Sequence, residues 1–123
     1  MRQLAKQLAA TLLGLSLSSV ALGQSCYTGT IGTLPIELAL EGTTREGQQT
    51  GMYVYTKYDT PIELAGTLKR GVLTLTERDS HGKATATFTV PAFAATRRNY
   101  AGTWKNLATG QQLPVVLTPK FDL

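Results

Sequence analysis

Hydrophobic and polar residues alternate along most of this chain from residue 27 onward. Short runs rich in Thr, Val, Ile, Leu and Tyr follow one another, and Gly, Pro and Asp separate them. Alternation of this kind is typical of half-buried strands, and Gly and Pro mark the turns between them. The pattern predicts eight strands, at 27–32, 36–41, 50–57, 62–68, 72–77, 84–90, 100–105 and 113–118.

The spacing of the predicted strands indicates how they are connected. No window after residue 27 keeps a helical spacing of apolar residues, and 92–98 is the one place where a single helical turn fits. Because most links are short, sequential strands should be neighbours. We therefore expect an all-β fold, a single antiparallel meander of about eight short strands. Either a curled open sheet or a small up-and-down β-barrel satisfies this pattern.

A repeated pentapeptide marks two of the strands. Pro-Ile-Glu-Leu-Ala occurs at 35–39 and again at 61–65. Each copy places Pro at the head of an alternating run, where a strand tolerates it. The alternation turns the Ile and Leu of each copy toward the core and turns Glu37 and Glu63 toward solvent. We interpret these glutamates as solvated surface residues and not as a catalytic carboxylate pair.

The first 23 residues have the organisation of a secretory signal peptide. Arg2 and Lys6 form a short basic region, an apolar stretch follows at 8–22, and small residues precede position 24. The apolar stretch is too short and too rich in Ser and Thr for a membrane span, which needs about 20 apolar residues. We predict cleavage before Gln24, one domain at 24–123, and a periplasmic or secreted protein with no stable membrane insertion.

Charge and cysteine content indicate which kinds of partner and anchor the protein is expected to lack. The chain has 12 basic and 8 acidic residues, a formal charge of +4, but two of the basic residues lie in the signal peptide. The rest are spread along the chain, whereas nucleic-acid binding requires a clustered basic surface. Cys26 is the single cysteine, and the residues before it differ from a lipoprotein cleavage site. We predict a free thiol in a frayed N-terminal segment, no lipid anchor and no nucleic-acid partner.

Candidate catalytic and metal-binding groups are sparse. Asp79, Ser80 and His81 are consecutive, and consecutive residues in a hairpin do not form a catalytic triad. Asp and Ser are instead favoured in turns because they hydrogen-bond to nearby backbone. One His and one Cys far apart in sequence are too few for a structural zinc site. The sequence thus predicts neither an enzyme nor a metal site, and no cofactor.

Two tyrosines of the third predicted strand are candidate binding residues. Tyr53 and Tyr55 share a face with Lys57, and Tyr is frequent in protein–protein hot spots. The alternative is that both rings belong to the core, with Met52 and Val54 on the outer face. Alternation alone does not decide between the two faces, and we favour the core.

The longest predicted loop, 91–99, supplies the other candidate surface. It carries Phe93 beside Arg97 and Arg98. Loops on a rigid scaffold often carry function, and Arg and aromatic residues are enriched at binding interfaces. We predict that these three residues form part of a binding surface.

Several segments also carry a recognisable pattern. Segments 27–32, 35–40 and 51–57 contain G-x-I-G, P-I-x-L-x-L and G-x-Y-x-Y-x-K, and I-x-L-x-G and L-x-L-x-E follow at 62–66 and 73–77. Together they resemble a pattern of uncharacterised bacterial exported proteins, over about half of residues 24–123. The resemblance implies a periplasmic or surface β-domain, and it implies no activity or site residue.

These observations favour an exported, non-enzymatic protein that binds another protein in the periplasm, of the inhibitor or immunity type. The alternative is a barrel that binds a small apolar ligand in its mouth, or a glycan on Tyr53, Tyr55 and Trp104 if those rings face outward. The accessibility of these rings separates the hypotheses.

Overall fold

A computed structural model describes residues 24–93 and 98–120, which form eight β-strands. The alternating pattern predicted every strand to within two residues at each end. The expected helical turn at 92–98 falls largely on residues 94–97, outside the described residues. The strands are β1 (Ser25–Ile31), β2 (Leu34–Leu40), β3 (Gln48–Tyr55), β4 (Ile62–Lys69), β5 (Val72–Arg78), β6 (Ala84–Val90), β7 (Tyr100–Asn106) and β8 (Gln112–Pro119).

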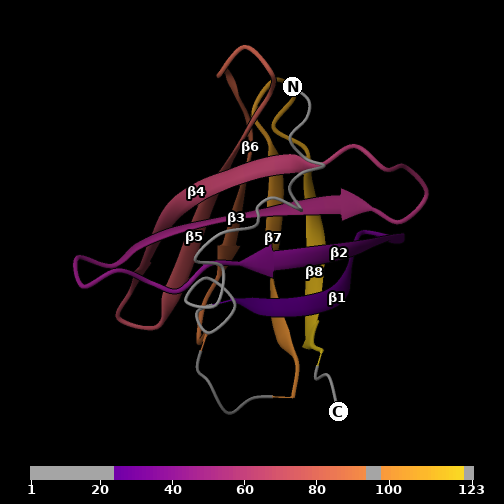
Figure 1. The fold of residues 1–123 in the computed structure, drawn as a ribbon. Coiled ribbons are helices and arrows are strands. Elements are labelled where there is room, and N and C mark those ends of the chain that lie inside the picture. The colour runs from indigo at the N-terminus through magenta and orange to yellow at the C-terminus, as the bar shows by residue number, and fades with distance from the viewer. Residues whose placement is uncertain (1–23, 94–97, 121–123) are drawn as a thin grey trace.

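The strands form an antiparallel meander that closes into a barrel (Figure 1). Each strand pairs with the next, and β1 also pairs with β8, from Tyr27 opposite Pro119 to Ile31 opposite Val115. The sequence pattern was compatible with both an open sheet and a barrel. The pairing of β1 with β8 shows that the sheet is a closed barrel. Closure leaves no free edge that could pair with another chain.

The inner face of the barrel is the hydrophobic core. Along β5 and β6, Leu73, Leu75 and Phe88 are essentially inaccessible, whereas the threonines between them face outward. Such an alternation is expected when one face of a sheet is buried and the other is hydrated. The core cluster contains Tyr27, Ile31, Ile36, Leu38, Leu40, Tyr53, Leu64, Leu73, Leu75, Phe88, Val90, Tyr100, Val115 and Leu117.

Glycines at inward positions allow neighbouring strands to approach closely. A Cβ atom on Gly66 would lie 1.8 Å from the carbonyl oxygen of Thr74, and one on Gly51 would lie 2.3 Å from that of Ala39. These separations are far below van der Waals contact, so a side chain at either position would push the strands apart. Glycine within a strand commonly marks a sharp bend of a barrel wall.

The repeated pentapeptide has the predicted orientation. Glu37 lies on the outer wall of β2, where Lys120 donates a hydrogen bond to it at 2.9 Å. Glu63 is exposed on β4, while Ile36 and Leu64 of the two copies are buried. The prediction that both glutamates face outward is confirmed.

The two ends of the barrel differ in their connections (Figure 1). One end carries the turns of four hairpins, β1–β2, β3–β4, β5–β6 and β7–β8, and we call it the hairpin end. The other carries residues 24 and 120 and the links that follow β2, β4 and β6, and we call it the terminal end. Cys26 lies at the terminal end; it is exposed and free, but it belongs to β1 and opposes Ala39, so the predicted frayed segment is wrong.

Three aromatic rings close the terminal end. The ring centroids of Phe93 and Tyr100 are 4.5 Å apart, and Tyr27 lies 5.9 Å from Phe93 and 6.2 Å from Tyr100. The backbone N–H of Phe93 donates to the carbonyl of Gly71 at 2.7 Å, which fixes the start of the link after β6. Phe93 is therefore partly buried against the core. Its predicted place on a binding surface stays a prediction, for a ring that is partly exposed and packs on Tyr27 and Tyr100.

Candidate functional site at the hairpin end

The hairpin end holds a carboxylate on the inner side of the barrel wall. Glu77 lies near the end of β5, after Leu73 and Leu75, whose side chains are in the core. Because side chains alternate along a strand, Glu77 continues this inward row. Its side chain is partly buried.

Three strands supply hydrogen-bond donors to this carboxylate. The hydroxyl of Tyr53 on β3 donates to Glu77 Oε1 at 2.5 Å, and the indole Nε1–H of Trp104 on β7 donates to the same oxygen at 3.2 Å. The hydroxyl of Thr85 on β6 donates to Oε2 at 3.0 Å. Glu77 thus connects β5 to three other strands.

A β-bulge directs Thr85 toward the carboxylate. The register shifts so that Glu77 opposes Ala86 and Arg78 opposes Ala84, leaving Thr85 as the extra residue. Its hydroxyl also lies 3.2 Å from the backbone carbonyl oxygen of Glu77. Simple alternation places Thr85 on the outer face, but a bulge re-aims a side chain.

Tyr53 forms the floor of this site. It is only 1% exposed, and its ring packs edge-on against Phe88 at 5.2 Å and Tyr55 at 5.4 Å. Burial, reinforced by the hydrogen bonds with Glu77 and Tyr55, raises the pKa of Tyr53 far above its ordinary value of about 10. The phenol therefore stays protonated and donates to Glu77.

The charge of Glu77 has no opposite charge beside it among the described residues. Within residues 24–93 and 98–120, no cationic nitrogen lies within the 4.0 Å of an ion pair with Glu77. The ion pair found there joins Glu37 and Lys120 on the outer wall. The partners of Glu77 are therefore neutral donors, which stabilise the carboxylate but do not cancel its charge.

Aromatic rings lead from this carboxylate to solvent. Tyr58, in the link after β3, is 60% exposed, and its ring centroid lies 6.5 Å from that of Tyr55. Tyr55 is partly buried and contacts the buried ring of Tyr53. The series of rings therefore runs from the exposed rim to the donor of Glu77.

Large apolar side chains are exposed on three of the four hairpins at this end. Tyr58 lies on β3–β4, Leu34 follows the β1–β2 turn and is 44% exposed, and Leu107 lies in the β7–β8 turn and is 44% exposed. These three hairpins are consecutive around the barrel, because β8 pairs with β1 and β2 pairs with β3. Leu34, Tyr58 and Leu107 are called the apolar rim below.

The fourth hairpin, β5–β6, is polar and has the hydrogen bonds of a turn. Asp79 Oδ1 accepts from the backbone N–H of Lys83 at 3.0 Å and from that of His81 at 2.9 Å. These bonds lower the pKa of the Asp79 carboxyl. The expected local role of Asp79 in the turn is confirmed.

The other predicted site residues do not come together. Tyr53 is in the core, so it is not a surface contact, and Tyr55 is partly buried. Lys57 is exposed, but it lies in the turn beyond β3 and not in the strand. Arg98 is exposed at the terminal end, and Arg97 lies outside the described residues. The predicted groups therefore belong to opposite ends of the barrel.

Sequence reasoning missed the central residue of the site. Glu77 was not singled out as a candidate site residue. The signal that identifies it is its spacing from Leu73 and Leu75, which places a carboxylate at the end of an inward apolar row. Trp104 was named only as part of a possible glycan surface; its indole is partly buried, and its N–H is directed at Glu77.

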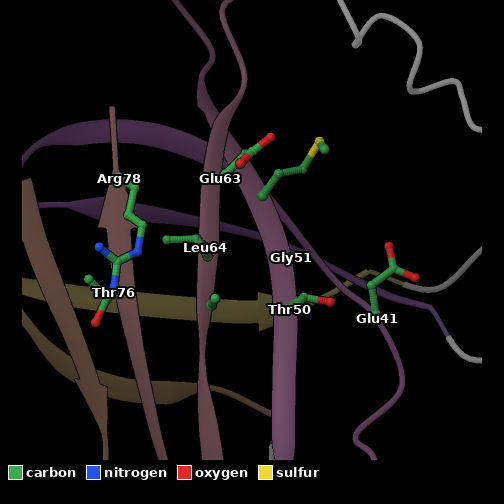
Figure 2. Close-up of a pocket in the computed structure, with 9 residues that line it drawn as sticks. Glu41, Thr50, Gly51, Glu63, Leu64, Thr76 and Arg78 are labelled. Carbon is green, nitrogen blue, oxygen red and sulfur yellow. The ribbon is translucent and has the colours of Figure 1, made fainter. Parts of the chain in front are cut away.

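A shallow groove of about 260 Å³ lies on the outer wall, across β3, β4 and β5 (Figure 2). The charged residues that line it are Glu41, Glu63 and Arg78. Figure 2 shows that their charged ends point in different directions and do not converge on one point. A site that orients a small ligand needs convergent polar groups, so the hairpin end is the stronger candidate.

Among the described residues, no group of three or more His, Cys, Asp or Glu side chains could hold a metal ion. No helix there is long and apolar enough to cross a membrane.

Comparison with known proteins adds no assignment. Neither the models of protein families nor the curated proteins give a match to this chain. The function is therefore argued from the hairpin end itself.

Proposed function

We propose that this chain is an exported, non-enzymatic binding protein that recognises another protein through the hairpin end of its barrel. The observation that supports this proposal is the apolar rim, with three large side chains 44% to 60% exposed on three consecutive hairpins. Apolar side chains gathered at one end of a domain commonly mark an interaction surface.

The composition of the rim suits a protein partner. Tyr58 is a ring with a polar tip, the kind of residue that dominates protein–protein hot spots. Leu34 on the adjacent β1–β2 hairpin and Leu107 on the next hairpin along, β7–β8, add apolar area. Partly buried Tyr55 and Trp104 lie below this rim, so a partner side chain that enters between the hairpins meets aromatic rings.

The barrel interior favours this function over that of a carrier. Fourteen buried side chains form the core cluster, and they include bulky Tyr53 and Phe88. An apolar ligand enclosed by the barrel would have to displace these residues. A glycan platform of Tyr53, Tyr55 and Trp104 is also disfavoured, because Tyr53 is only 1% exposed.

A capture experiment with matched variants tests the proposal. Protein expressed from the full chain is immobilised through a tag at the C-terminus and incubated with an extract of the source cells. The last strand, β8, runs toward the terminal end (Figure 1), so this attachment leaves the hairpins accessible. The test variant is Tyr58→Ser with Leu107→Ser, and the control is Val72→Ser, which changes a 37% exposed residue at the terminal end.

We expect the unchanged protein and Val72→Ser to capture the same stoichiometric partner in equal amounts. The double variant should capture at least about tenfold less of it, as expected when a hot spot is lost. A partner retained by the double variant and lost by Val72→Ser would contradict the proposal. Failure to capture any stoichiometric partner would also count against it.

A further inference from the structure

We infer that the hairpin end binds a primary ammonium group against Glu77, and that the protein partner supplies it as a lysine side chain. The inference rests on the proposed function for the source of the lysine. The site itself is defined by the contacts of Glu77, Tyr55, Tyr58 and Trp104.

The first argument is the charge of the site. A carboxylate that leaves water loses hydration, and neutral hydrogen-bond donors restore only part of it. Glu77 is partly buried, its donors are Tyr53, Trp104 and Thr85, and it forms no ion pair with the described residues. A cation that enters the hairpin end would complete this arrangement, whereas an anion would be repelled.

Second, the acceptor positions that remain on the Glu77 carboxylate favour an ammonium over a guanidinium. A carboxylate offers about four lone-pair positions. Tyr53 and Trp104 both donate to Oε1, and Thr85 donates to Oε2. About one position remains, on Oε2. The forked guanidinium of Arg binds carboxylates best through two parallel hydrogen bonds, whereas an ammonium can donate a single one.

The third argument is the aromatic lining. Cations are attracted to the faces of Tyr and Trp rings at distances of up to about 6 Å. Tyr58 and Tyr55 form a continuous series of rings from the exposed rim inward, with centroids 6.5 Å apart. The four-carbon stem of lysine can pack on these apolar rings while its ammonium reaches the carboxylate.

A metal ion fits this site poorly. Ca²⁺ requires six to eight oxygen ligands, whereas the described residues contain no group of three or more candidate metal-binding side chains. The tyrosine and tryptophan donors direct hydrogen atoms at Glu77, and a hard cation would compete with them for the same oxygens. An organic cation that adds one hydrogen bond is the better match.

The single tryptophan of the chain reports on the site directly. Trp104 donates to Glu77, so a cation bound to that carboxylate should change its fluorescence. Protein expressed from the full chain is titrated at low ionic strength with N-acetyl-lysine methylamide. N-acetyl-arginine methylamide and the uncharged N-acetyl-norleucine methylamide serve as comparison ligands. We expect saturable lysine binding with a Kd of the order of millimolar, as for a small fragment.

Two matched carboxylate variants show whether Glu77 carries the binding. Glu77→Gln removes the charge, and Glu63→Gln removes an exposed charge on the outer wall. We expect Glu77→Gln to raise the Kd for the lysine ligand at least about tenfold, the effect expected for loss of a charged contact. Glu63→Gln should leave this Kd within about twofold of its original value. Tyr58→Leu, at an exposed position, should weaken binding by about threefold through loss of a cation–π contact.

Some results would overturn the inference. These are equal binding of the norleucine and lysine ligands, tighter binding of the arginine ligand, or no response of Trp104 to the lysine ligand. An unchanged affinity in both Glu77→Gln and Tyr58→Leu would do the same. The proposed function is judged separately: a partner that needs Tyr58 and Leu107 but binds Glu77→Gln normally would support that function and refute the lysine site.

Discussion

The two ends of the barrel use the same kind of residue for different purposes. At the terminal end, Tyr27, Phe93 and Tyr100 pack on one another, with centroids as close as 4.5 Å. At the hairpin end, Tyr53 and Trp104 direct their polar hydrogens at a carboxylate. Aromatic rings close one end as an extension of the core and surround a charge at the other.

This difference supports the hairpin end as the proposed binding end. A charge in a partly buried position carries a desolvation cost, which neutral hydrogen-bond donors offset only in part. At the terminal end, Tyr27, Phe93 and Tyr100 pack together as an extension of the core. The carboxylate and the apolar rim are the two features on which the proposed interaction at the hairpin end rests.

The largest effect is expected at the terminal end. Tyr100→Ala should lower the free energy of unfolding by about 3 kcal/mol, because it removes a large ring that is 4% exposed and leaves a cavity beside Phe93. Urea unfolding measures this change. A loss below about 1 kcal/mol would mean that the rings at this end are not a structural seal.

At the hairpin end, two substitutions of Glu77 should lower the free energy of unfolding by different amounts. Glu77→Leu leaves the Tyr53, Trp104 and Thr85 donors without their acceptor and should cost about 2 kcal/mol. Glu77→Gln keeps an acceptor oxygen and removes the charge, so it should cost less than about 1 kcal/mol. Equal costs in urea unfolding would show that the fold needs the charge itself.

High pH should affect both ends, and more strongly the hairpin end. The pKa values of Tyr53 and Tyr27 are raised, chiefly by burial, so both phenols stay neutral in the folded protein after those of the unfolded chain ionise. Stability is therefore fully present below about pH 10 and falls as the pH rises above it. Tyr53→Phe should make this decline shallower than Tyr27→Phe does, as measured by urea unfolding at several pH values. The opposite order would place the more strongly perturbed phenol at the terminal end.

The smallest effect on stability is expected at the rim. Tyr58→Ser changes a side chain that is 60% exposed, so the free energy of unfolding should change by less than about 0.5 kcal/mol. Partner capture should nevertheless fall. A large loss of stability instead would mean that Tyr58 supports the fold, and the apolar rim would lose its functional interpretation.

The fold was largely predictable from the sequence, because a buried face imposes strict alternation on each strand. Ala86, Phe88 and Val90 of β6 show this clearly, with threonines between them. Closure was not predictable, since the pairing of β1 with β8 joins residues some 90 positions apart and leaves no local signal. The bulge at Thr85 was likewise hidden, because alternation continues through it in the sequence.

The site was predictable only in part. Alternation did not decide whether Tyr53 or Met52 faces the core. The structure shows that Tyr53 faces the core, because its side chain is buried. The contacts of the Phe93 ring with Tyr100 were not predictable, because a loop position in the sequence does not indicate which way a side chain points. Glu77 was identifiable in principle from its place in an inward row, but its donors come from three other strands and required the closed barrel.

A chemical-shift titration by NMR tests the contrast between the ends most directly. Uniformly ¹⁵N-labelled protein is titrated with N-acetyl-lysine methylamide, and the indole N–H of Trp104 is followed together with the backbone amides. The predicted shifts are confined to the hairpin end, at Trp104, Tyr58 and Glu77, and leave Tyr27 and Tyr100 unchanged. Shifts centred on the terminal end, or none at the Trp104 indole, would contradict the assignment of the hairpin end as the binding end.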